Sequence, residues 1–159
     1  MSEAQLKTMR HIETVRNYLN TCIRELLHRA EQHDQSKLEP PEVDTYDVIT
    51  HQLRGLTYGS DAYRTVLSAH KPAIEHHYAH NRHHPEYHPH GYKDMTLLDL
   101  IEMLCDWQAA SLRHSDGDIQ QSIVINQNRF GYSEELAQIF RNTIAWLETQ
   151  RTYHKADES

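Results

Sequence analysis

Apolar residues recur at steps of three and four positions over most of this 159-residue chain. That period matches one face of an α-helix, whereas a half-buried strand would alternate at every second residue. The longest such segment covers residues 4–31. Its apolar stripe consists of Ile12, Val15, Leu19, Ile23, Leu26, Leu27 and Ala30. We therefore expect the chain to begin with one long amphipathic helix.

The same period predicts further helices, separated by proline, glycine and polar turns. They cover about residues 42–54, 60–69, 72–84, a segment that begins after Thr96, 117–129 and 134–150. Only five glycines and five prolines are present, which leaves little room for an all-β design. We predict an all-α fold, a single-domain bundle of about six to seven helices over residues 1–150. Residues 151–159 are expected to be a frayed C-terminal tail.

The segment after Thr96 is the most apolar of the predicted helices. Thr96 suits the N-cap position, and Asp99 follows three residues later as in a capping box. This helix is expected to lie at the centre of the bundle, yet it carries Asp106 next to Trp107. A carboxylate is costly to bury without a partner. A cation beside Asp106 would be such a partner.

Charge and cysteine content exclude several classes of protein. A formal charge of −7 argues against binding duplex nucleic acid through its phosphates. A small anionic substrate stays compatible, because a bound cation reverses the local potential. Two cysteines, Cys22 and Cys105, form no disulfide framework and favour a reducing cytoplasm. We find neither a secretion signal nor an apolar run long enough for a bilayer, and therefore expect no membrane partner.

Histidine is unusually frequent: fourteen are present, and seven of them fall between His76 and His90. If this run is helical, His77, Asn81 and His84 share one face, and His76 and His83 form a parallel row. His33 and Asp34 stand side by side after the first predicted helix, and His11 lies upstream. Imidazoles and carboxylates together suit Mn, Fe, Co, Ni or Zn. For His11 and for any single histidine of the run, a hydrogen-bonded core histidine is the alternative interpretation.

The order of His11, the His33-Asp34 pair and Asp106 resembles the HD-domain superfamily of metal-dependent phosphohydrolases, which are all-helical. Residues 33–37, His-Asp-Gln-Ser-Lys, are similar to the His-Asp-Ile-Gly-Lys stretch of that superfamily, with Ser36 in place of glycine. The chain also resembles a small, uncharacterised family of phage and bacterial HD-like proteins. That likeness covers most of residues 10–148 and rests on the Asn-x-His-His-Pro-Glu segment and the Asp-Leu-Ile-Glu-Met-Leu-x-Asp-Trp helix.

The resemblance implies one or two divalent transition-metal ions and a phosphate-ester substrate. The first ion would be held by His11, His33, Asp34 and Asp106, and a second by His77 and His84 or by their neighbours His76 and His83, with Asp34 as a bridge. Asp34 and Lys37 would be catalytic, with Lys37 reaching the phosphate. Asn81 and Arg82 would contact substrate. The expected activity is that of a phosphomonoesterase or phosphodiesterase, which uses a metal-activated water on a nucleotide or related metabolite.

Two other functions remain open from the sequence. A few HD-type proteins hold a mixed-valence di-iron pair and oxygenate a carbon substrate, and the additional histidines suit the six ligands that such a pair needs. A non-catalytic metal-binding bundle is the third hypothesis. The sequence decides neither the substrate nor the number of ions, and it leaves room for a homodimer.

Overall fold

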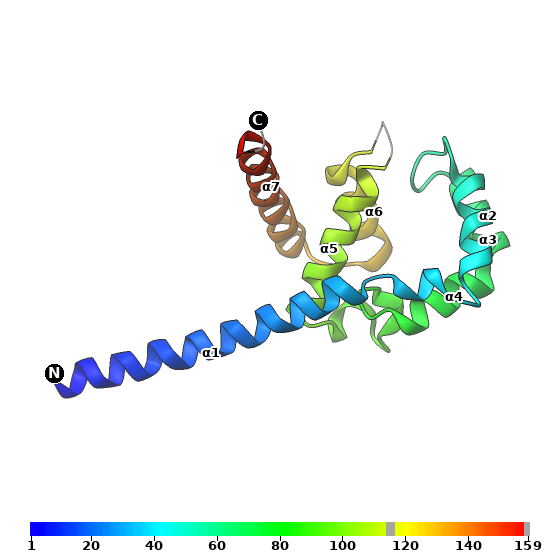
Figure 1. Ribbon diagram of the computed structural model, residues 1–159. Helices are drawn as coiled ribbons and strands as arrows, with labels where there is room; N and C mark the ends of the chain where they lie inside the picture. Colours follow the sequence, from blue (N-terminus) through cyan, green and yellow to red (C-terminus); the bar gives the residue numbers. More distant parts are fainter. Residues whose placement is uncertain (114–116, 158–159) are drawn as a thin grey trace. The chain divides into compact units, whose positions relative to one another are not determined.

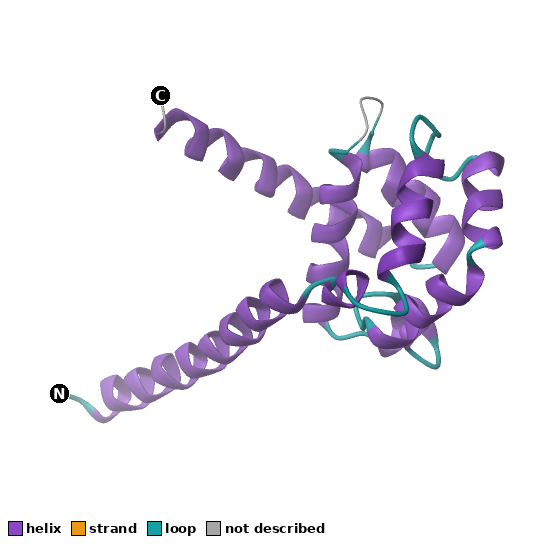
Figure 2. Cartoon of the chain, turned by 45° about the vertical axis from the view of Figure 1, so that its right-hand side comes forward, coloured by secondary structure: helices purple, strands orange, loops and turns teal. Residues whose placement is uncertain are grey.

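The computed structural model describes residues 1–113 and 117–157, and all regular secondary structure in these ranges is helical (Figures 1 and 2). This confirms the predicted all-α fold. Within the described ranges none of the helices is both long and apolar enough to cross a lipid bilayer. The α-helices are α1 (Glu3–Gln32), α2 (Val43–Leu53), α3 (Asp61–Ala69), α4 (Lys71–His80), α5 (Leu97–Ser111), α6 (Ile119–Phe130) and α7 (Glu134–Asp157), and the 3₁₀ segments are η1 (Gln35–Leu38), η2 (Pro85–Tyr87) and η3 (Gly91–Asp94).

The chain, expected as one domain over residues 1–150, falls into two compact units, Met1–Gln35 and Ser36–Ser159. The first unit consists of α1, an unbroken helix of 30 residues drawn in blue in Figure 1. Ser2 begins it with a capping box: its hydroxyl accepts from the backbone N–H of Gln5, and the Gln5 side chain accepts from the backbone N–H of Ser2. At 1.5 Å per residue, α1 is about 45 Å long.

The second unit has a hydrophobic core formed mainly by its last three helices. α5 packs beside α6, and α6 packs beside α7. α5 begins with the predicted capping box of Thr96 and Asp99, and it buries Met103 and Leu104 as expected of a central helix. The buried residues of this core are Met103, Leu104, Ile119, Ile123, Tyr132, Ala137, Phe140 and Ile144.

The end of α7 differs from the prediction. α7 runs to Asp157, so residues 151–157 continue the helix that we expected to end near residue 150. The final two positions of the expected tail, 158 and 159, lie outside the described residues. The periodicity of residues 134–150 therefore located this helix but gave its end too early.

The helix that carries the histidines also ends earlier than predicted. α4 ends at His80, and Asn81 has an extended backbone, with φ −121° and ψ 102°. The side-chain amide of Asn81 donates to the carbonyl of His77 at 2.8 Å. His84 is extended as well, because the ring of Pro85 disfavours helical geometry in the residue before it. His83 and His84 consequently lie in a turn and not on a helix.

Candidate metal centre

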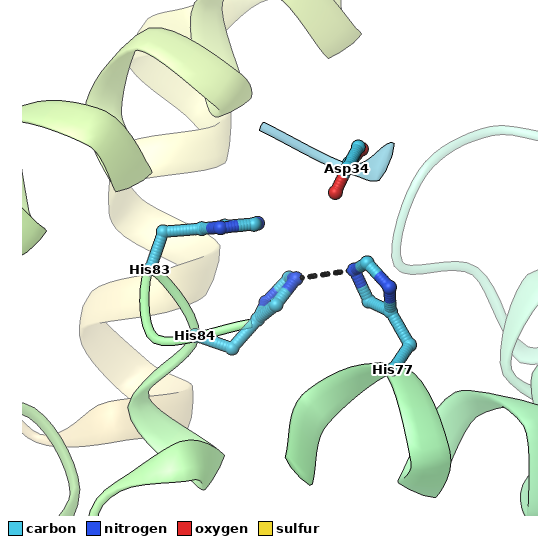
Figure 3. A group of neighbouring side chains, drawn as sticks. All are labelled: Asp34, His77, His83 and His84. Carbon is cyan, nitrogen blue, oxygen red and sulfur yellow. Dashed lines mark hydrogen bonds between the residues drawn. The ribbon is translucent and has the colours of Figure 1, made fainter. Parts of the chain in front are cut away.

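His77 lies in the last turn of α4 and is 1% exposed. Its Nδ1 is 3.0 Å from Oε2 of Glu42, a carboxylate just before α2. The carboxylate therefore accepts the Nδ1 proton, which leaves the lone pair of His77 on Nε2. That Nε2 lies 2.9 Å from Nε2 of His84 (Figure 3). Two imidazole nitrogens thus approach each other within the second unit, with one of them oriented by a buried anion.

His83 joins these two histidines. Its ring is 2% exposed, and its Nδ1 lies 3.2 Å from Oε1 of Glu102 on α5. One ligand atom from each of His77, His83 and His84 lies within 4.8 Å of the others. Two nitrogens bound to one ion at about 2.1 Å and at right angles would be about 3.0 Å apart. In the structure these nitrogens of His77 and His84 share a hydrogen bond, and the same separation is compatible with a shared transition-metal ion, which the three imidazoles have the chemistry to hold.

Glu42 is the residue on which the orientation of His77 depends, and its side chain is fully buried. Its carboxylate also accepts from Nδ1 of His76 at 2.7 Å and from the hydroxyl of Ser36 at 3.1 Å. Burial alone would raise the pKa of Glu42, but hydrogen bonds from His76 and His77 outweigh it and hold the pKa below its usual value. Glu42 gave no functional signal in the sequence, because an acidic residue at a helix start is already explained by the helix dipole.

Ser36 and Asn81 also contact His77. The Ser36 hydroxyl lies 3.3 Å from Nδ1 of His77 and accepts from the Asn81 amide at 2.8 Å. Asn81, which we predicted as a substrate contact, thus links the turn after α4 to Ser36 and His77. Ser36, the residue that replaces a glycine in the resembled motif, uses its hydroxyl for these contacts.

Asp106 of α5 is half-buried, as the apolar character of that helix predicted. A ligand atom of Asp106 lies within 4.8 Å of one of His83. His83 is therefore within 4.8 Å, ligand atom to ligand atom, of the other two histidines and of the Asp106 carboxylate, all in the second unit.

His33 and Asp34 belong to the first unit and follow the last residue of α1 directly. Nε2 of His33 lies 3.6 Å from Oδ2 of Asp34. Asp34, the fourth side chain drawn in Figure 3, has a φ of 58°, in the left-handed region that helix ends usually fill with glycine. Backbone strain of this kind in a non-glycine residue is often found at functional sites.

His11 does not share a site with this pair. It lies on α1, 22 residues before His33, and α1 is unbroken from Glu3 to Gln32. The rise of the helix separates the two histidines by about 33 Å. The expectation that His11 binds the same ion as His33 and Asp34 of its own chain is therefore wrong, because the resemblance fixed the order of the residues and not their distance.

Lys37 and Arg82, which we predicted to contact phosphate and substrate, contact other side chains of the protein. Nζ of Lys37 lies 5.1 Å from the ring centre of Tyr46 on α2. Arg82 donates from Nε and Nη2 to the two carboxylate oxygens of Asp99, at 2.7 and 3.2 Å. Because Asp99 is fully buried, Arg82 neutralises a carboxylate of the helix cap in addition to any contact with substrate.

Comparison with known proteins adds a family but no activity. A search of curated proteins and a search of solved structures each gave no match. One family model matches residues 1–152, which is nearly the whole chain, and it describes a family of unknown function. The protein therefore belongs to the family DUF5662.

Proposed function

We propose that this protein is a metal-dependent phosphohydrolase that acts on a nucleotide or a related small phosphorylated metabolite. The observation that carries the proposal is the convergence of His77, His83 and His84, with two of their nitrogens 2.9 Å apart. Glu42 and Glu102 lie behind two of these rings, as carboxylates commonly do behind metal-binding histidines. A bound cation would lower the pKa of a water molecule and neutralise the oxygens of a phosphoryl group.

We assign Asp106 and the His33-Asp34 pair to the same centre. Asp106 is supported by its proximity to His83. The His33-Asp34 pair is assigned on its resemblance to the His-Asp motif of the HD-domain superfamily. The left-handed backbone of Asp34 adds independent support for a functional role.

The proposed ligands favour particular ions. Imidazoles mixed with carboxylates suit Mn, Fe, Co, Ni or Zn, whereas Mg²⁺ and Ca²⁺ prefer shells made of oxygen. Asp106 beside His83 gives a second position for an ion, so the centre suits one ion or two. Lys37, three residues beyond Asp34, is the proposed contact to phosphate or to the leaving group.

The test begins with protein purified without metal-affinity resin, whose metal content is measured by elemental analysis. Phosphate release from a panel of nucleotides and phosphate esters is then measured under anaerobic conditions with added Mn²⁺ or Co²⁺. We expect bound transition metal and phosphate release, and we expect both to be lost in His77→Ala. The matched control is His90→Ala, because His90 is an exposed histidine whose ring contacts only Asp94 among the hydrogen bonds described for it.

The outcomes separate the three hypotheses. A His77→Ala protein that folds and keeps its full metal content would refute the proposed centre. Bound iron with turnover that requires oxygen would replace the proposal by the mixed-valence di-iron oxygenase. Retained metal with no turnover on the panel would leave a non-catalytic metal-binding protein.

A further inference from the structure

A second group of polar side chains lies next to the histidines, on α6. Asn126 and Arg129 are three residues apart and therefore share one side of this helix. Asn126 is 1% exposed, and its Oδ1 accepts from the hydroxyl of Tyr58 at 3.4 Å. Its Nδ2 is buried and has no hydrogen-bond partner among the residues that the structure describes. A buried amide that donates to nothing is costly, and this one therefore indicates a missing acceptor.

Arg129 connects this group to the proposed metal centre. Its Nη2 donates to the hydroxyl of Tyr78 at 3.3 Å, and the ring centre of Tyr78 lies 4.7 Å from that of His84. The same Nη2 donates to Oε1 of Glu86 at 2.5 Å. The Arg129 side chain is 45% exposed, so a small solute in water can reach its guanidinium.

The charge states of these groups favour an anionic ligand. Burial lowers the pKa of Arg129, but the charge of Glu86 and the contact with Tyr78 outweigh it and raise the pKa, so the guanidinium stays cationic. Burial raises the pKa of the Tyr58 hydroxyl, which keeps its proton at neutral pH and donates it to Oδ1 of Asn126, leaving Nδ2 of that amide for an anion.

We infer that Arg129 and Asn126, together with the hydroxyl of Tyr78, bind the non-bridging oxygens of a phosphate group beside the histidine cluster. A planar guanidinium, an amide N–H and a phenolic hydroxyl supply donors from several directions, which suits the three oxygens of a tetrahedral phosphate. In the structure the carboxylate of Glu86 lies against the guanidinium, and it would compete with such a ligand. The assignment of this phosphate to the substrate rests on the proposed hydrolase function, whereas binding of the anion does not.

Because the Glu86 carboxylate would compete with phosphate for Arg129, substitutions of these two residues should change phosphate affinity in opposite directions. Inorganic phosphate is titrated into the full-length protein, with its own metal content unchanged, by calorimetry or by ³¹P nuclear magnetic resonance. We expect Arg129→Gln to weaken phosphate binding at least tenfold and Glu86→Gln to strengthen it severalfold, because the latter removes the internal anion. Arg141→Gln is the matched control, since Arg141 forms the same kind of ion pair, with Glu134 on α7.

A simple surface ion pair would behave differently. Breaking it from either side would lower stability in both variants and leave phosphate binding unchanged. The inference is overturned if the unmodified protein binds no phosphate, if Arg129→Gln binds it normally, or if Glu86→Gln weakens binding as Arg129→Gln does. Arg129→Lys, which keeps the charge, serves as the variant for comparison if Arg129→Gln is poorly folded.

Failure of this inference is distinguishable from failure of the proposed hydrolase. Phosphate binding that depends on Arg129, in a protein that cleaves no ester, would support the anion subsite and refute the hydrolase. Cleavage of an ester with a normal KM in Arg129→Gln would support the hydrolase and refute the subsite. An increased KM in Arg129→Gln, with unchanged metal content, supports both.

Discussion

Replacing Glu42 by glutamine tests whether a buried carboxylate orients the proposed metal ligand His77. The carboxylate accepts from two imidazoles at once, His76 at 2.7 Å and His77 at 3.0 Å. A glutamine has one carbonyl oxygen, so its amide N–H₂ group would face one of these two N–H groups. At least one buried donor would lose its acceptor, which costs about 1–3 kcal/mol in the free energy of unfolding. The His77 ring would also lose the anion that fixes its tautomer.

The effect on metal binding follows from the same contact. Outer-shell partners of metal ligands typically contribute about 10–100-fold in affinity, which equals about 1.4–2.7 kcal/mol. We therefore expect Glu42→Gln to bind Zn²⁺ about 10–100-fold more weakly, measured by competition with a chromogenic chelator. The helical circular dichroism of the variant should stay unchanged.

The matched control is Glu75→Gln on α4. Glu75 lies near the same histidines in the sequence, but it is exposed and pairs with Lys71 at 3.3 Å. We expect this variant to bind Zn²⁺ as the unmodified protein does, because an exposed ion pair contributes little. A folded Glu42→Gln protein with unchanged Zn²⁺ affinity would show that Glu42 does not orient a metal ligand, and it would remove the main support for His77.

Three further predictions concern acid stability, backbone strain and the ion pair of a buried aspartate. The folded-state pKa of Glu42 is lowered, so its contribution to stability is present above its usual pKa of 4.5 and is lost as the pH falls through the folded-state value. Denaturant unfolding between pH 7 and pH 3 should therefore show a smaller decrease in the free energy of unfolding for Glu42→Gln than for the unmodified protein. Asp34→Gly should raise the midpoint of thermal unfolding, with a gain of up to about 1 kcal/mol in the free energy of unfolding, because glycine adopts a φ of 58° without strain. The same variant should contain less metal. A gain in stability with full metal content would exclude Asp34 as a ligand. Arg82→Ala should cost about 2 kcal/mol in urea unfolding by leaving the buried Asp99 without its cationic partner, and unchanged stability would show that Arg82 is not needed there.

Sequence periodicity predicted the helices well, because each helix carries its own repeating apolar positions and its own caps. Thr96 and Asp99 form the expected capping box, and α1 runs over nearly the residues that its stripe indicated. Periodicity contains no information about the distances between helices. His11 matched a pattern in order but lies about 33 Å from His33 along one helix. Glu42 gave no sign of its contacts with the histidines, which arise only when α2 and α4 fold into one unit.

The histidine run shows how residues predicted to lie together can do so through a different geometry. We expected His77 and His84 to meet on one face of a helix, but seven residues of helix advance about 10.5 Å, which exceeds the reach needed for two nitrogens 2.9 Å apart. The break at Asn81 removes this limit, because the extended residue and the turn before Pro85 bring the chain back toward α4. A continuous helix would present its histidines as a row along one side, whereas an interrupted one can gather them around a point. The proline and the asparagine, and not the histidines alone, are therefore what makes this segment suitable for binding an ion.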